Sequence, residues 1–262
     1  MHPVIFKFGK LVVYSYSLMV VAAFCLMVLY GVLEARRVKE DPEKAIDIGI
    51  LMFIASFIGA RILHCLINYP IYLHDPLRIL KIWEGGLIYY GGLAGALAAG
   101  TIYVFHQHLS WPKWADIVAP TAMIALAVGR VGCFLNGCCY GTIAPQWLPW
   151  KVTYPAAAMP LHFAGIPLHP APIYESITTA VIFLFLAFRA KHKRFQGEIF
   201  WLMVALYALA RIFLEIFRAD PRGEINFLHL STSQVISILL IFISGYILGM
   251  NYLRPGVQGQ RS

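Results

Sequence analysis

The sequence has little charge. Asp, Glu, Lys and Arg make up only 13% of its 262 residues, 60% are hydrophobic, and the mean hydropathy is +0.69. A soluble domain has roughly 25% charged and about 45–50% apolar residues. This composition excludes most soluble folds, and with them intrinsic disorder, a coiled coil and collagen. We therefore expect an all-α polytopic membrane protein.

Cysteine is also scarce, and the basic residues are dispersed. Five cysteines in apolar surroundings are too few for a disulfide scaffold. The net charge of +8 comes from Lys and Arg that do not form one basic segment interleaved with aromatics, so no nucleic-acid partner is expected. The first apolar run is too long for a cleaved signal peptide, and Glu34-Ala35-Arg36-Arg37 follows it where a small-residue cleavage site would lie.

Seven segments are long and apolar enough to cross about 30 Å of hydrocarbon. No linker is long or polar enough to carry a second domain, so residues 1–262 are expected to form one integral membrane domain with a periplasmic-side loop region at 140–172. The predicted spans are Leu11–Leu33, Ala45–Ile67, Gly86–Phe105, Ile117–Leu135, Ile173–Ala190, Ile199–Phe217 and Val235–Tyr252.

The basic residues between the spans predict the orientation. Eleven of them fall in the loops after spans one, three and five and in the C-terminal tail, against seven on the opposite side. Because cytoplasmic loops are rich in Lys and Arg, the C-terminus is expected in the cytoplasm and the N-terminus outside. Lys7 and Lys10 oppose this assignment.

A few charged residues lie at membrane depth, where they usually serve a function. Arg61 could pair with Asp47 or Glu175 and have only a structural role. Arg211, Glu215 and Arg218 are spaced i, i+4 and i+7, which places them on one helix face with a surplus arginine. Because a guanidinium group binds phosphate well, the surplus arginine favours an anion-binding site over the alternative that these residues only pair with one another.

Glycines surround another arginine at the end of the fourth predicted span. The segment from Gly129 through Gly141 contains four glycines and Arg130, so the helix can end in a loop whose N–H groups are exposed to an anion. A lipid headgroup phosphate is the anion expected at that depth. A second glycine-rich segment, residues 85–95, is explained by close helix packing, except for Tyr89 and Tyr90.

Three cysteines near Arg130 leave several interpretations open. Adjacent Cys138 and Cys139 are a poor pattern for tetrahedral zinc, and no spacing supports His162 or His169 as further ligands, so no metal is predicted. A vicinal disulfide or redox thiol is favoured over a metal, and inert, partly buried cysteine is the leading single alternative for these three residues, which include Cys133.

At these residues the chain resembles the bacterial prolipoprotein diacylglyceryl transferase family, and the resemblance runs over nearly the whole chain. It rests on Ser15–Met19, Gly59–Arg61, Gly129–Gly141, His169–Glu175, Tyr207–Arg218 and Ser233-Gln234. These segments resemble, in order, the family's Tyr-Gly-Leu-Met, Gly-Gly-Arg, Gly-Arg-x-Gly-Asn-Phe-x-Asn-x-Glu-x-x-Gly, His-Pro-x-Gln-Leu-Tyr-Glu and Tyr-Gly-x-x-Arg-x-x-x-Glu-x-x-Arg elements and the polar start of its last span.

The resemblance implies a seven-span inner-membrane enzyme that moves a diacylglyceryl group from phosphatidylglycerol to a prolipoprotein cysteine, without a cofactor. Its expected partners are phosphatidylglycerol, membrane lipids and a thiol acceptor, the lipobox cysteine. Three positions depart from the family pattern: Tyr90 replaces its histidine, Cys133 its asparagine and Cys138 its glutamate.

The chemistry requires stabilised phosphate and a deprotonated acceptor thiol. A phenol is a poor base near neutral pH, because its ordinary pKa is about 10, but the phenol of Tyr90 can donate a hydrogen bond to the departing oxygen. The candidate catalytic residues are Arg130, Tyr90, Arg211, Glu215 and Cys138. The candidate substrate-binding residues are Tyr16, Arg61, Gly132, Cys133, Asn136, Gly141 and Arg218.

Two alternatives remain beside this function. A paralogous enzyme could act on a thiol acceptor other than a lipoprotein, or a membrane thiol oxidoreductase or redox sensor could use Cys133, Cys138 and Cys139 on the same scaffold. A transporter is disfavoured because no predicted span is interrupted at mid-membrane by paired Gly and Pro.

Overall fold

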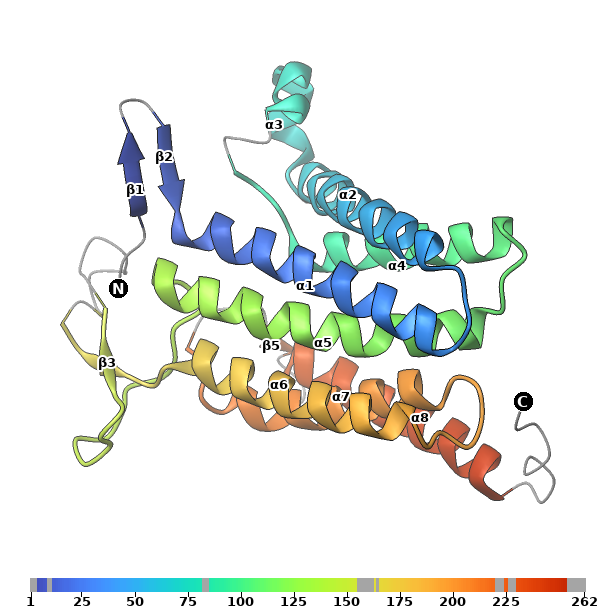
Figure 1. Cartoon of the computed structure of the whole chain (residues 1–262). Coiled ribbons are helices and arrows are strands. Elements are labelled where there is room, and N and C mark those ends of the chain that lie inside the picture. Colours follow the sequence, from blue (N-terminus) through green and yellow to red (C-terminus); the bar gives the residue numbers. More distant parts are fainter. Residues whose placement is uncertain are drawn as a thin grey trace. The chain divides into compact units, whose positions relative to one another are not determined.

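The computed structural model describes residues 4–8, 11–81, 85–154, 163, 165–219, 224–225 and 230–253. Most of these residues are helical, as Figure 1 shows. The chain divides into two compact units, one of Met1–Met27 with Ala115–Ser262 and the other of Val28–Trp114. Helix α1 (Ser15–Arg37) and helix α5 (Trp111–Asn136) each contribute to both units.

The Val28–Trp114 unit is built on two long helices, α2 (Pro42–Ile67) and α4 (Tyr89–His106). Between them lie the short helix α3 (Tyr69–His74) and the 3-10 helix η1 (Pro76–Leu80). Asp41 caps α2 by accepting a hydrogen bond from the Glu43 amide at 2.9 Å, and proline follows at the first helical position, where no N–H is needed.

Helices α2 and α4 pack antiparallel through small residues. A Cβ atom at Gly92 would lie 3.1 Å from the Ser56 carbonyl oxygen, and one at Gly100 would lie 3.0 Å from the Met52 sulfur. Glycines spaced by four residues allow two helix backbones to approach this closely. The packing role predicted for the glycines of residues 85–95 is confirmed at Gly91 and Gly95, whose Cβ positions meet the backbone of α2.

The other unit contains α5, α6 (Ala171–Ala190), α7 (Glu198–Glu215) and α8 (Thr232–Leu253). Helix α7 packs against both α6 and α8, which lie beside it in Figure 1. Apolar side chains of α5, α6 and α7 share one core, which includes Met123, Leu186 and Ile199. This packing brings the polar residues of three helices together.

A buried carboxylate fixes the start of α7. Asp116 of α5 accepts hydrogen bonds from the backbone amides of Gly197 at 2.9 Å and Phe200 at 3.1 Å, and it pairs with Lys193 at 2.9 Å. The first amides of a helix have no partner within the helix, so an acidic group from a neighbouring helix stabilises them. Gly197, at φ 93°, allows the chain to turn into α7.

The all-α prediction is incomplete, because the structure also contains short β-strands. The first predicted span includes residues 11–14, but these form β2 (Leu11–Tyr14), which pairs antiparallel with β1 (Val4–Phe8), and helix α1 begins only at Ser15. The β-branched residues Val12 and Val13 favour a strand there. The other two hairpins consist of two-residue strands: β3 (Val152–Thr153) with β4 (Pro167–Leu168), and β5 (Glu224–Ile225) with β6 (Leu230–Ser231).

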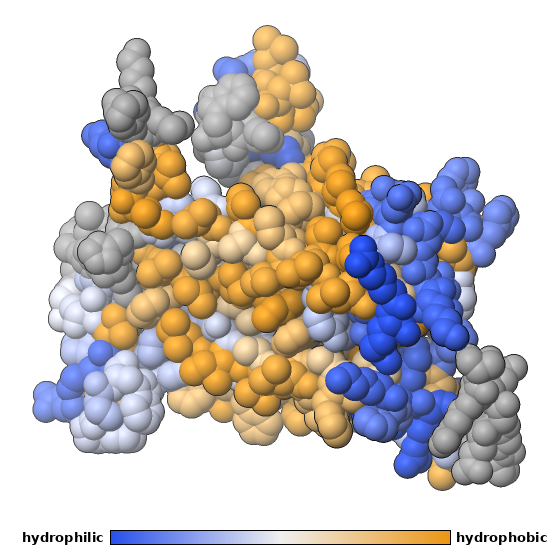
Figure 2. Space-filling model, viewed as in Figure 1, coloured by the Kyte–Doolittle hydropathy of each residue, from blue (hydrophilic) through white to orange (hydrophobic). Residues whose placement is uncertain are grey.

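Among the described residues, α1, α2, α5, α6 and α8 are long and apolar enough to cross a membrane. Apolar side chains cover much of the face shown in Figure 2, and Phe242 is 72% exposed. Exposing so much apolar surface to water would be unfavourable, whereas lipid accommodates it. The chain is therefore a multi-pass membrane protein.

The third and sixth predicted spans are also helices, although with shifted ends. Helix α4 starts at Tyr89 instead of Gly86, and α7 ends at Glu215 instead of Phe217. Neither is among the five apolar helices. Glycines and tyrosines lower the hydropathy of α4, whereas α7 is apolar but contains three charged residues, Glu198, Arg211 and Glu215.

Candidate functional site

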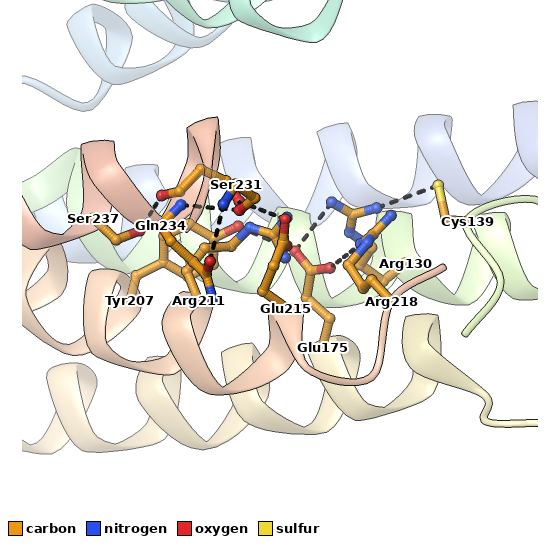
Figure 3. Close-up of polar contacts among 11 residues, drawn as sticks. Arg130, Cys139, Glu175, Tyr207, Arg211, Glu215, Arg218, Ser231, Gln234 and Ser237 are labelled. Atoms are coloured by element: carbon orange, nitrogen blue, oxygen red, sulfur yellow. Dashed lines mark hydrogen bonds and ion pairs between the residues drawn. The ribbon is translucent and has the colours of Figure 1, made fainter. Parts of the chain in front are cut away.

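The centre of the site is Glu175 in the first turns of α6, a side chain only 1% exposed. One carboxylate oxygen pairs with Arg130 of α5 at 3.0 Å and accepts a hydrogen bond from the Tyr207 hydroxyl at 3.1 Å, and the other accepts from Arg218 at 2.9 Å. Figure 3 shows the two guanidinium groups converging on this carboxylate. A buried charge requires such partners, since taking it out of water is costly.

A second ion pair lies next to this one. Arg211 of α7 pairs with Glu215 one turn later at 2.7 Å, and Ser233 of α8 donates a hydrogen bond to Glu215 at 2.8 Å. Arg211 and Glu215 share a helix face, as their spacing predicts. Arg218 does not lie on that face by helical periodicity, because α7 ends before it.

Positive charge is in excess in this cluster. Three guanidinium groups face two carboxylates, so one positive charge remains uncompensated within the pairs. The Nε of Arg130 and the Nη1 of Arg211 are buried without a hydrogen-bond partner among the described residues. Buried donors of this kind are suited to an anionic ligand.

Gly141 holds Arg218 in place through the backbone. The two residues form an antiparallel β-bridge, and the Gly141 amide donates to the His169 carbonyl at 3.1 Å. A Cβ atom at Gly141 would lie 2.5 Å from that carbonyl oxygen and 2.6 Å from the Phe217 carbonyl oxygen, so only glycine fits. This explains the signature glycine by close backbone approach.

The three cysteines after Arg130 lie together. The sulfur atoms of Cys133, Cys138 and Cys139 are all within 4.8 Å of one another and half-buried. Cys139 has φ 60°, which a residue with a side chain rarely adopts, and Gly137 has φ 79°. These two left-handed residues fold the chain back so that adjacent thiols reach the helix end.

Polar contacts join the cysteines to the arginine cluster. The Nη1 of Arg130 lies 3.6 Å from the Cys139 sulfur, a contact drawn in Figure 3, and the Asn136 side chain hydrogen-bonds Cys138. The pKa of the Cys139 thiol lies below its ordinary value because the neighbouring Cys133 and Cys138 thiols and two nearby arginines favour its charged form.

Tyr16 and Gly132 join α1 to this end of α5. A Cβ atom at Gly132 would lie 2.9 Å from the Cβ of Met19 and 3.4 Å from the Tyr16 ring. The Tyr16 phenol is close enough to interact electrostatically with Arg130 and the three cysteines. Tyr16 is therefore next to the cluster, and its role in orienting a headgroup stays a prediction.

Two predicted site residues, Arg61 and Tyr90, lie in the Val28–Trp114 unit. Arg61 pairs with neither of the partners expected from the sequence, Asp47 and Glu175. Its guanidinium group donates hydrogen bonds of 2.5–3.2 Å to five backbone carbonyls, those of Arg78, Ile79, Lys81, Gly85 and Gly86. Asp47 instead accepts from Tyr103. These contacts favour a role for Arg61 in holding the segment after α3.

Tyr90 lies in the first turn of α4, 44% exposed and edge-to-face with Tyr89 at 5.9 Å between ring centroids. Its phenol is therefore accessible, and its proposed hydrogen bond to the departing oxygen stays a prediction.

Sequence reasoning missed the central role of Glu175. One signal could have indicated it, because Glu175 ends the segment that resembles the family's His-Pro-x-Gln-Leu-Tyr-Glu element. Tyr207 and Ser233 also lie in segments that resemble the family, but nothing else in the sequence pointed to them. Of the two histidines considered beside the cysteines, His169 bonds Tyr174 at 3.0 Å and is not part of the sulfur cluster. His162 lies outside the described residues.

Known proteins resemble this chain over most of its length. The prolipoprotein diacylglyceryl transferase family model matches residues 3–250. The chain belongs to this family. Relatives named phosphatidylglycerol–prolipoprotein diacylglyceryl transferase include that of Clostridium tetani, 30% identical over 97% of this chain and 99% of its own.

Two further relatives in the prolipoprotein diacylglyceryl transferase family carry the same name. The protein of Geobacter sulfurreducens is 30% identical over 92% of each chain. That of Fervidobacterium nodosum is 35% identical over 94% of this chain and 85% of its own. The resemblance noted from the motifs therefore extends over almost the whole length of the chain.

Proposed function

We propose that this protein transfers the diacylglyceryl group of phosphatidylglycerol to a cysteine thiol of a prolipoprotein, the lipobox cysteine, during lipoprotein maturation. The names of its relatives support the lipid donor and the protein acceptor. The observation that carries the proposal is the excess of buried guanidinium groups. Arg130 and Arg211 each have a buried N–H donor that no described residue satisfies.

These donors suit a phospholipid headgroup. A phosphate diester carries one negative charge, which equals the uncompensated charge of the arginine cluster. Guanidinium groups donate hydrogen bonds to phosphate oxygens and keep their charge at any accessible pH. Glu175 and Glu215 hold the arginines in position before the lipid arrives, so the site is preorganised.

The reaction follows from this arrangement. The acceptor thiolate attacks the C3 carbon of the glycerol that carries the acyl chains, the C3–O bond breaks, and its electron pair remains on the leaving phosphate monoester. Arg130 and Arg211 stabilise the negative charge that develops on that phosphate. Tyr16 and Asn136 orient the headgroup, and Arg218 and Gly141 maintain the site.

We further infer that the protein is a single transferase domain with seven spans in the bacterial inner membrane. The packing of α4 on α2, and of α7 between α6 and α8, supports α4 and α7 as the two additional spans. The distribution of Lys and Arg supports an N-terminus outside and a C-terminus in the cytoplasm. The phosphate-binding end of α5 then faces the outer leaflet, where the prolipoprotein cysteine is presented.

The test uses the purified full-length protein in detergent with isotope-labelled phosphatidylglycerol and a lipobox peptide. Mass spectrometry is expected to detect a thioether between the peptide cysteine and the diacylglyceryl group, together with the phosphate product. A peptide with serine in place of cysteine is the matched control and should remain unmodified. An unmodified cysteine peptide in the presence of folded protein and intact lipid would contradict the proposal.

A further inference from the structure

The three cysteines have the spacing of metal ligands. Their sulfur atoms lie within 4.8 Å of one another. A zinc ion with Zn–S bonds of about 2.3 Å and tetrahedral angles holds its sulfurs about 3.8 Å apart. The upper limit of 4.8 Å exceeds that spacing by only about 1 Å, although the adjacency of two of the cysteines in the sequence argues against a shared ion.

The backbone explains why adjacency is no obstacle. Cys138 and Cys139 follow Gly137 in a turn with two left-handed residues, and the Cys138 amide donates to the Cys133 carbonyl at 3.1 Å. The non-glycine residue at φ 60° costs about 1 kcal/mol or more, and such strain persists where surrounding structure maintains it. The turn directs both thiols toward the same side as Cys133.

The cluster offers three ligands, and the described residues add no fourth His, Cys, Asp or Glu to it. Structural zinc sites are closed by four protein ligands, whereas catalytic zinc sites have three and keep one position for water or substrate. The half-buried sulfurs leave that position accessible. The ligand number therefore fits an ion that takes part in a reaction.

The local charge also fits. Three thiolates and one zinc ion carry a net charge of −1, and Arg130 contacts the Cys139 sulfur at 3.6 Å. A guanidinium beside the sulfurs stabilises negative charge on them. The same Arg130 pairs with Glu175 in the phosphate site, so a metal held here would be adjacent to the proposed lipid headgroup.

We propose that Cys133, Cys138 and Cys139 bind a zinc ion whose fourth position takes the sulfur of the acceptor cysteine. This role of the ion in transfer rests on the proposed function, whereas zinc binding itself does not. The acceptor thiol coordinates zinc and releases its proton to solvent, since a metal-bound thiol is deprotonated. The thiolate then forms the S–C3 bond as the C3–O bond breaks, and the neutral thioether leaves the ion.

This site meets a chemical need of the chain. The family pattern that this chain resembles has histidine and glutamate, which can accept a proton, at the positions where this chain has Tyr90 and Cys138. A phenol and a thiol are poor bases near neutral pH. Zinc activates the acceptor thiol without a protein base. A zinc site therefore accounts for the loss of the histidine and the glutamate at Tyr90 and Cys138, and also for the cysteine at position 133.

The first experiment measures metal binding to the full-length protein in detergent. After reduction and incubation with zinc, we expect one bound zinc per chain, and cobalt substitution should produce the intense thiolate-to-cobalt absorption of a sulfur-ligated ion. Cys138→Ala should lose both signals. Cys25→Ala, which removes an exposed cysteine of α1 outside the cluster, is the matched control and should retain them.

Defined results would overturn the binding site. One is a reduced wild-type protein that binds no zinc, and another is a Cys138→Ala variant that binds as much zinc as the wild type. A disulfide among the three cysteines that re-forms in the presence of zinc would have the same consequence. If Cys138→Ala does not fold, Cys133→Ser and Cys139→Ser supply the same comparison, and the cobalt spectrum of the wild type still decides whether sulfur ligates the ion.

The second experiment measures transfer after chelation and after zinc is restored. Loss on chelation and recovery with zinc are expected. Full transfer by zinc-free protein would overturn activation of the acceptor while leaving the proposed function intact. Bound zinc without transfer to the lipobox peptide under any condition would contradict the proposed function and leave the metal site standing.

Discussion

Arg130 reaches Cys139 with one guanidinium nitrogen at 3.6 Å and Glu175 with another at 3.0 Å. One side chain therefore joins the thiol cluster at the end of α5 to the carboxylate that holds Arg218. In the proposed reaction these two groups of residues serve the acceptor sulfur and the leaving phosphate. Because the guanidinium group is planar and rigid, Arg130 fixes the position of the thiol cluster relative to Glu175.

Replacement of Arg130 is expected to abolish lipid transfer. Arg130→Ala should lower the rate at least about 100-fold, because removing one preorganised donor to developing charge costs that much. Arg130→Lys keeps the charge but loses the planar set of N–H donors, so its rate should lie between those of Arg130→Ala and the wild type. The measurement is thioether formation from labelled phosphatidylglycerol and a lipobox peptide.

Arg37→Ala is the control for this change, because Arg37 forms an ion pair with Glu34 within its own helix. It should leave transfer near the wild-type rate. Full activity in Arg130→Ala would refute the assignment of the phosphate site.

Glu175→Gln should destabilise the protein. The amide cannot neutralise Arg130 and Arg218, and its N–H groups must face one of them. Removing one partner of a buried ion pair typically costs about 3–5 kcal/mol. The expected result is a clear fall in the thermal midpoint in detergent, accompanied by loss of transfer.

Glu40→Gln is the matched carboxylate change. Glu40 pairs with Lys113 at 2.6 Å, with both side chains about a quarter exposed, so the substitution should cost less than about 1 kcal/mol. Equal thermal midpoints for the two variants would show that Glu175 is not the centre of a buried charge network.

Gly141→Ala should disturb the site through the backbone. The new methyl group would lie 2.5 Å from the His169 carbonyl oxygen, so the loop must move and the bridge to Arg218 must open. Lower thermal stability and slower transfer are expected. Gly245→Ala in α8 meets nothing within 4 Å and should be neutral or slightly stabilising.

The phenol of Tyr90 is testable by a single-atom change. Tyr90→Phe removes the hydrogen bond proposed for the departing oxygen and should slow transfer about 100-fold with no effect on folding. Tyr89→Phe, the neighbouring residue on the same helix turn, should retain the wild-type rate. A Tyr90→Phe variant as fast as the wild type would exclude the phenol from the reaction.

Much of the fold was predictable because it depends on local properties. Among the described residues, hydropathy located the five apolar helices with ends displaced by up to about six residues, since an apolar run of about 20 residues in lipid must satisfy its own backbone. Helical periodicity correctly placed Arg211 and Glu215 on one face. It did not predict the end of α7 before Arg218, because a bridge to Gly141 sets that end.

The sequence by itself determined the membrane location, the helices and the surplus of buried positive charge. Only the tertiary structure decided which groups meet: Glu175 with Arg130 and Arg218, Arg61 with backbone carbonyls, and the three cysteine sulfurs with one another. Hydropathy and periodicity are properties of consecutive residues. Hydrogen-bond partners depend on helix packing and on left-handed turns such as that at Cys139, which bring together side chains that the sequence separates.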